Sequence, residues 1–244
     1  MTDIAQQISS SLDALTQEFD IVAHNLANVS TVGYKRRCNT FSQSLEAQEK
    51  KAQGASSEDI NFKTTFDFSQ GNIVSTENPL DFALYGQGFF LVETTEGPLY
   101  TRNGTFHLNQ NGQIVDSMGR IIAGDAGPIT VPNTVGISQL NVSSDGNISA
   151  DRIKVGKFKL VDFKENQAKL VPVGDGCFRI TDTSIQPDDA ENLIVKQGFQ
   201  EASNVKIIDE LVDMIMVSRL YEANMKFVSA KKDTSSSLMN VAMG

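Results

Sequence analysis

The chain is poor in the residue types that build most metal and catalytic sites. Its 244 residues include no Trp, two His (His24 and His107) and two Cys (Cys38 and Cys177). One pair of cysteines leaves room for a single long-range disulfide but not for a disulfide framework. None of these four residues has a partner at the spacing that metal ligands show, so we expect no zinc site.

Positive charge and long apolar runs are also scarce. Lys and Arg number 21 against 30 Asp and Glu, which gives a net charge of −9. An acidic chain without a basic patch is repelled by nucleic acid and by anionic lipid. No stretch approaches the roughly eighteen apolar residues of a membrane helix, and the first residues form no apolar run of the signal-peptide type. We therefore expect no nucleic-acid partner, no direct membrane insertion and no classical secretion.

Apolar residues form a helical stripe near each end of the chain. The N-terminal stripe alternates steps of four and three residues, at Ile8, Leu12, Leu15, Phe19, Val22, Leu26 and Val29. The C-terminal stripe has the same spacing, at Ile207, Leu211, Met214, Ser218, Tyr221, Met225 and Val228. This is the heptad spacing of a coiled coil. It predicts two long helices that bury their stripes against each other, with further partners covering what remains exposed.

The middle of the chain alternates apolar with polar residues, as strands do. Turn dipeptides separate these runs and predict β-hairpins, at Glu96-Gly97, Asn111-Gly112, Asp145-Gly146 and Glu165-Asn166. The predicted fold class is α+β, mainly β, with an all-β central domain and long terminal helices that pair as a coiled coil. The expected parts are 1–33 (N-terminal helix), 34–75 (extended connector), 76–190 (β domain), 191–202 (return linker) and 203–244 (C-terminal helix).

No arrangement of residues in the sequence predicts catalysis. Gly86-Gln87-Gly88 lacks the remaining glycine of a nucleotide-binding loop and precedes a strand-like run rather than a helix. Asn111-Gly112 and Asp145-Gly146 lack the alternating carboxylates of a calcium loop. We therefore predict no catalytic residue, no cofactor, no metal and no small-molecule substrate. An enzyme with two carboxylates in a cleft stays an alternative, as does a secreted adhesin or effector.

Three blocks of sequence resemble the axial proteins of the bacterial flagellum, the rod and hook subunits. The first runs from Asn25 to Arg36 and is similar to the N-terminal signature of that family, through Asn25, Leu26, Ala27, Asn28, Gly33, Tyr34 and Lys35. The second block begins at Asp81 and continues to Val115, and the third runs from Ser203 to Asn224. The resemblance therefore covers both ends and the middle of the chain.

The resemblance implies a structural, non-enzymatic subunit of the flagellar basal-body rod that serves motility. In that family the terminal helices form the inner tube of a helical assembly, and the β domain lies outside. The implied partners are other copies of the chain, neighbouring rod proteins and the flagellar export apparatus, which delivers the subunit to the periplasmic rod without a cleaved signal peptide. The short connector from Tyr34 to Gly71 favours the proximal-rod protein. The distal-rod protein and other rod or hook subunits are the alternatives.

Overall fold

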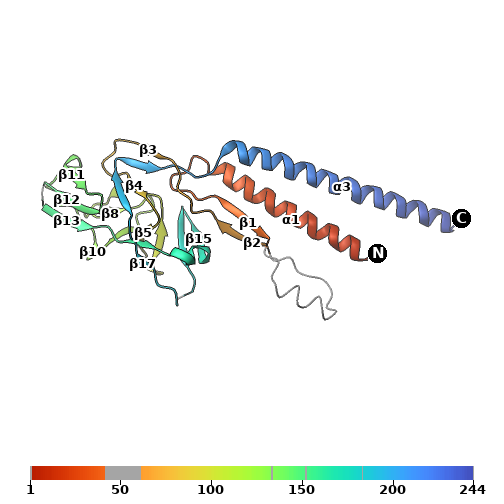
Figure 1. Ribbon diagram of the computed structural model, residues 1–244, viewed down its shortest axis with the longest axis horizontal. Coiled ribbons are helices and arrows are strands. Elements are labelled where there is room, and N and C mark those ends of the chain that lie inside the picture. Colours follow the sequence, from red (N-terminus) through yellow and green to blue (C-terminus); the bar gives the residue numbers. More distant parts are fainter. Residues whose placement is uncertain (1, 42–61, 133, 152, 183, 244) are drawn as a thin grey trace. The chain divides into compact units, whose positions relative to one another are not determined.

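The computed structural model describes residues 2–41, 62–132, 134–151, 153–182 and 184–243 (Figure 1). The chain divides into two compact units. We call residues 1–27, 37–66 and 206–244 the helical unit, and residues 28–36 and 67–205 the β unit. Of the expected connector 34–75, residues 42–61 lie outside the described residues.

Two helices make up most of the helical unit. They are α1 (Thr2–Ala27) and α3 (Ile207–Met243), which lie side by side (Figure 1). Neither contains Gly or Pro, and Asp209 and Glu210 stand in the first turn of α3, where the helix dipole favours acids. Strands β1 (Arg37–Phe41) and β2 (Phe62–Phe66) form an antiparallel ribbon, and β1 contacts α1.

The predicted coiled-coil pairing of the two helices is wrong. Among the stripe residues whose side chains are described, only Val22 is buried, at 1% exposure. Phe19, Leu211 and Met225 are each more than 40% exposed, and Val29 lies beyond the end of α1. The contact between the helices instead buries Glu210 and Val217, which are outside the stripes. The physical reason lies in α3, whose apolar residues surround the helix instead of forming one seam.

The fold is therefore mostly β, with one helix near each end of the chain. The β unit also has two short 3-10 helices, at Ile137–Gln139 and Lys164–Lys169. Its strands are β3 (Ile73–Ser75), β4 (Phe82–Tyr85), β5 (Phe89–Glu93), β6 (Leu99–Thr101), β7 (His107–Leu108), β8 (Ile114–Val115), β9 (Ile121–Gly124), β10 (Gly127–Pro128), β11 (Leu140–Val142), β12 (Asn147–Ala150), β13 (Ile153–Lys157), β14 (Leu160–Asp162), β15 (Leu170–Gly174), β16 (Cys177–Ile180), β17 (Asp188–Asp189), β18 (Ile194–Gln197) and β19 (Phe199–Glu201).

The largest sheet of the β unit has the strand order β15-β16-β6-β5-β9-β8-β7, with β10 beside β9 and with β14 pairing both β5 and β17. Three smaller sheets are β11-β12-β13, β18-β4 and β19-β3, and every pairing among the described strands is antiparallel. Three predicted hairpins are confirmed, since β5 pairs β6, β7 pairs β8 and β11 pairs β12. The glycines of their turns, Gly97, Gly112 and Gly146, have the positive φ that these turns need.

The fourth predicted hairpin, at Glu165-Asn166, does not form. A 3-10 helix (Lys164–Lys169) separates β14 from β15, and the two strands take different partners. Strand β14 lies between β5 and β17, whereas β15 pairs with β16 at the edge of the sheet. Pairing with strands distant in the sequence, and not the local turn sequence, therefore decides where β14 and β15 lie.

Four phenylalanines form the centre of the core of the β unit. Phe82, Phe90, Phe106 and Phe158 are at most 1% exposed, and in five of their six pairs the ring centroids lie 5.1–6.1 Å apart. Most of these pairs meet at the tilted or edge-on angles that aromatic rings prefer. The core is thus complete within the β unit.

The described residues form neither a disulfide nor a membrane-crossing helix. Cys38 and Cys177 are not joined by a disulfide. In the described parts of the chain, no helix combines the length and the apolar character that crossing a membrane requires.

Candidate assembly surface

The outer surface of α3 is strongly apolar. Large apolar side chains that are at least 36% exposed follow one another along the helix, at Ile207, Ile208, Leu211, Val212, Ile215, Met216, Leu220, Tyr221, Met225, Phe227 and Val228. Single exposed apolar residues are ordinary on protein surfaces, but a contiguous patch of this kind marks an interaction site. We call these residues the apolar surface of α3.

A cleft of about 360 Å³ runs between α1 and α3. Leu15, Thr16 and Phe19 line it from α1. Four residues line it from α3, namely Val217, Ser218, Tyr221 and Glu222. The lining of the cleft is therefore mostly apolar, with three hydroxyl groups and one carboxylate.

Only some of the predicted stripe residues lie in the cleft or on the apolar surface of α3. The structure brings Leu15, Phe19, Ser218 and Tyr221 together in the cleft. Four more are exposed on α3, at Ile207, Leu211, Met225 and Val228, while Leu12, Leu26, Val29 and Met214 are half-buried and Val22 is buried. The side chain of Ile8 lies outside the described residues.

The stripe prediction missed six of the eleven residues of the apolar surface of α3. Ile208, Val212, Ile215, Met216, Leu220 and Phe227 fall between the heptad positions. Their signal was present, because a helix with apolar residues on all sides must be covered on all sides. A single heptad stripe cannot include these residues.

Asn25 fastens the C-terminal end of α1 within the helical unit. Its side chain is fully buried; Oδ1 accepts a hydrogen bond from the Arg37 backbone N–H at 2.8 Å, and Nδ2 donates to the Arg37 carbonyl at 2.9 Å. Nδ2 also donates to Glu210 Oε2, at 3.1 Å, in the first turn of α3. One side chain thus ties together α1, β1 and α3, which explains why an amide stands at this position of the motif.

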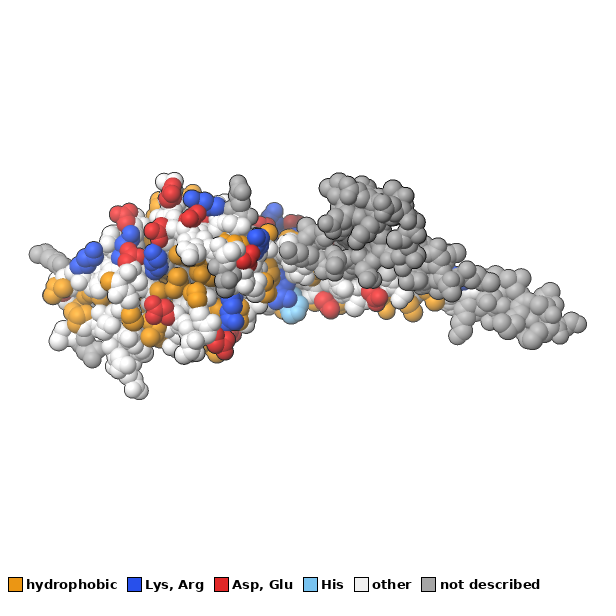
Figure 2. Space-filling model, turned by 90° about the horizontal axis from the view of Figure 1, so that it is seen from below, with side chains coloured by type: hydrophobic (Ala, Val, Ile, Leu, Met, Phe, Trp, Pro, Cys, Tyr) orange, Lys and Arg blue, Asp and Glu red, His pale blue; other side chains and the backbone are white. Residues whose placement is uncertain are grey.

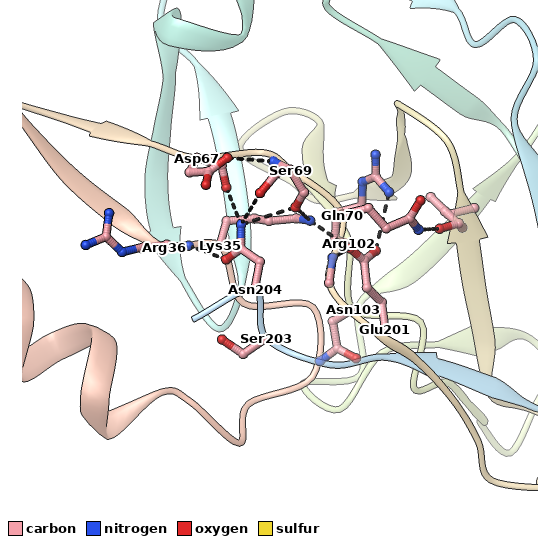
Figure 3. A network of polar contacts seen from close by, with 12 residues as sticks. Lys35, Arg36, Asp67, Ser69, Gln70, Arg102, Asn103, Glu201, Ser203 and Asn204 are labelled. Atoms are coloured by element: carbon pink, nitrogen blue, oxygen red, sulfur yellow. Dashed lines mark hydrogen bonds and ion pairs between the residues drawn. The ribbon is translucent and has the colours of Figure 1, made fainter. Parts of the chain in front are cut away.

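Lys35 has a different role, at the centre of a buried ion cluster in the β unit (Figure 3). Its Nζ lies 2.7 Å from Glu201 Oε1 and donates to the Ser69 carbonyl at 2.8 Å. Arg102 Nη1 lies 3.3 Å from the second oxygen, Glu201 Oε2. All three charged side chains are at most 2% exposed. Desolvation lowers the pKa of Lys35 below its usual value, and the Glu201 carboxylate opposes that shift.

Asn204 and Gly33 extend this cluster. The Arg36 backbone N–H donates to Asn204 Oδ1 at 2.7 Å, and Asn204 Nδ2 donates to the Asp67 carbonyl at 2.7 Å (Figure 3). Gly33 has φ +69°, and a Cβ there would stand 2.5 Å from the backbone N of Asn103. The motif glycine is therefore required both by its conformation and by this close backbone approach. Segments 33–36, 67–71 and 201–204 are held together as one cluster.

The surface of the β unit differs from the apolar surface of α3 because it carries many charged side chains. Figure 2 shows acidic and basic side chains mixed over the visible face of this unit, with apolar side chains between them. Exposed ion pairs such as Lys159–Asp189, at 2.7 Å, and Arg179–Glu96, at 3.1 Å, occur there. Mixed charges are typical of a surface that stays in contact with solvent.

Comparison with known proteins agrees with these features. Residues 9–35 match the family model described as flagella basal body rod protein. Residues 83–150 match the flagellar hook protein FlgE/F/G D1 domain, and residues 196–241 match the flagellar basal body rod FlgEFG protein C-terminal model. The flagellar basal-body rod protein FlgG of Agrobacterium fabrum is 32% identical, over 93% of this chain and 95% of the relative. The chain belongs to the flagellar basal-body rod proteins.

Other relatives belong to the same family, and their names are FlgF and FlgG. FlgF of Caulobacter vibrioides is 32% identical over 91% of each chain, and FlgG of Buchnera aphidicola from Schizaphis graminum is 31% identical over 90% of this chain. The identities to FlgF and to FlgG are nearly the same, so they do not distinguish the two. The predicted function is confirmed at the level of the family: this rod protein is a structural subunit of the flagellar basal body. The family assignment favours the rod interpretation over the adhesin or effector alternative.

Proposed function

We propose that the terminal helices are the part of this rod protein that polymerises. Their apolar residues, including those of both predicted stripes, would be covered by helices of other copies and of neighbouring rod proteins. The observation that carries the proposal is the apolar surface of α3, which the subunit by itself leaves exposed.

The energetic argument rests on transfer of apolar side chains from water. Fully burying a side chain of the Leu or Ile kind contributes roughly 1.5–3 kcal/mol, so covering a half-exposed one contributes about 1 kcal/mol. The exposed side chains of α3 are numerous enough for such terms to offset the entropy lost on association. Assembly through this surface is therefore the expected outcome of its composition.

Several finer assignments belong to the same proposal. We place the chain in the proximal rod, because its connector is short and its central block resembles the proximal-rod protein. In this proposal, 1–33 and 203–244 make the contacts between subunits and 76–190 faces outward. The segments 34–75 and 191–202 connect the β domain to the two helices. The subunit would reach the rod through the flagellar export apparatus and would catalyse no reaction.

The variant Leu211→Asp tests this proposal. Leu211 is 43% exposed, so a carboxylate there should leave the free subunit folded but become a buried, unpaired charge on assembly. Swimming motility should be lost in a strain whose own copy of this gene has been replaced by the variant. The matched control is Ile153→Asp, at an apolar residue of the β unit that is 65% exposed, which should leave motility intact. Normal rods built from Leu211→Asp would refute the proposal.

A further inference from the structure

The side of α3 that faces α1 is poor in apolar residues. Glu210 and Val217 are buried there, and Asn224 and Lys231, both half-buried, follow on the same side at intervals of seven residues. We call these four residues the inner line of α3. Three of them are polar or charged, although a helix normally turns its most apolar side toward its neighbour.

A nearby side of α3 is more apolar than the inner line. Met216, Leu220 and Phe227 lie within about 40° of one another around the helix, and roughly 70° from the inner line. They are 56%, 52% and 56% exposed. Turning this side toward α1 would cover three large side chains that are now in contact with water. Apolar burial alone therefore does not explain why the inner line faces α1.

We propose that the hydrogen bond between Asn25 and Glu210 determines which side of α3 faces α1. Both side chains are completely buried, and Asn25 Nδ2 donates to Glu210 Oε2 at 3.1 Å. Two further hydrogen bonds, of 2.8 and 2.9 Å, fix the Asn25 amide on the backbone of Arg37. The remaining N–H of the amide thus has one direction, and Glu210 accepts it only when the inner line is turned toward α1.

The strength of this hydrogen bond is sufficient to choose between two similar orientations. A hydrogen bond to a charged group stabilises about as much as the covering of one or two half-exposed apolar side chains. If α3 turned, the amide of Asn25 would also keep a buried N–H without its acceptor, which is unfavourable. Apolar contacts have no preferred direction, whereas hydrogen bonds do. A buried polar pair can therefore select one packing arrangement even where it adds little stability.

The consequence is that the apolar surface of α3 stays uncovered within the subunit. In this orientation Met216, Leu220 and Phe227 are presented to partners instead of being buried against α1. This consequence for assembly rests on the proposed function, whereas the orientation of α3 within one subunit does not. Asn25 and Glu210 are thus positioning residues, which are themselves buried and act on assembly through the orientation of α3.

Oxidation of two native methionines measures this orientation. Met214 is half-buried beside the inner line, whereas Met216 is 56% exposed. A short pulse of hydroxyl radicals oxidises exposed methionines to the sulfoxide, which mass spectrometry locates in the chain. The pulse samples the populated conformation rather than rare openings of the helix. In the unchanged full chain, Met216 should be oxidised several-fold more than Met214.

The variant Glu210→Ser removes the acceptor without making the inner line more apolar. Met214 should become more oxidised and Met216 less oxidised than in the unchanged chain, so that their ratio falls to one or below. Glu210→Gln keeps an oxygen that accepts from Asn25 and should preserve the original ratio. The matched control is Asp209→Ser, at the exposed neighbour of Glu210 in the same turn, which should also preserve it.

An unchanged ratio in Glu210→Ser would overturn the inference. A rise in the oxidation of both methionines would overturn it too, because it would show that Glu210 only stabilises α3. Swimming motility is the second measurement, and it should be lost with Glu210→Ser and kept with Glu210→Gln. A reversed ratio with normal motility would support the orientation within the subunit and contradict the proposed function, which Leu211→Asp tests independently.

Discussion

Phe106 in the β unit and Phe227 in the helical unit are the same side chain in opposite surroundings. Phe106 is completely buried among three other phenylalanines, whereas Phe227 is 56% exposed on α3. The difference extends to the whole of each unit, because the β unit encloses its own core while α3 leaves its apolar residues uncovered. A protein that must both fold and polymerise can keep these two tasks in separate parts of its chain.

The largest expected effect comes from shortening the two phenylalanines in turn. Phe106→Ala should lower the free energy of unfolding of the β unit by about 3–5 kcal/mol, because it leaves a cavity in a close-packed core. Phe227→Ala should leave that unfolding free energy unchanged, and should instead weaken assembly. Urea unfolding of both variants, followed by circular dichroism, measures the difference. Equal losses of unfolding free energy in the two variants would contradict the distinction between a buried core in the β unit and an uncovered surface on α3.

A smaller effect should follow when the buried ion cluster loses its carboxylate. Glu201→Leu removes the carboxylate that pairs with the buried charges of Lys35 and Arg102, which should cost about 3 kcal/mol of stability. The matched control is Glu96→Leu, which breaks the exposed pair with Arg179 and should change the unfolding free energy far less. If both variants unfolded at the same urea concentration, the cluster would not hold the segments around residues 35, 69 and 201 together.

The smallest of these effects concerns two glycines that both have positive φ. Gly33→Ala should cost roughly 1–3 kcal/mol in unfolding free energy, since it adds a steric clash with the Asn103 backbone to the conformational strain. Gly119 has φ +79° with nothing within 4 Å of an added Cβ, so Gly119→Ala should show the strain alone. Thermal unfolding of the two variants isolates the clash. A larger loss for Gly119→Ala would contradict the packing described around Gly33.

Local signals in the sequence predicted part of this fold. The turns at Gly97, Gly112 and Gly146 could be recognised because positive φ favours glycine at the turn itself. Pairings such as β4 with β18 and β3 with β19 could not, since they join residues more than a hundred positions apart. Helix positions were predictable from the lack of Gly and Pro and from apolar spacing. How the helices contact each other was not, because spacing alone does not show which side of α3 is left uncovered.

The candidate site was predicted to a similar extent. Residues of the family motif were recognised by resemblance, but their physical roles required the fold. Asn25 contacts Glu210, and Lys35 contacts Glu201, across 185 and 166 positions of the chain. No local pattern marks a lysine that will be buried against a distant carboxylate. By contrast, Leu15, Phe19 and Tyr221 stood in the predicted stripes and do line the cleft.

Hydrogen exchange of the full chain, before and after assembly, tests the central claim most directly. That claim is that the helical unit is completed by other copies, whereas the β unit is complete alone. Backbone amides of residues 207–231 should exchange rapidly in the free subunit, because isolated helices are marginal in water, and should become protected in the polymer. Amides of β5, β9 and β12 should be protected equally in both states. Strong protection of α3 in a dilute monomer, with no gain on assembly, would contradict the account.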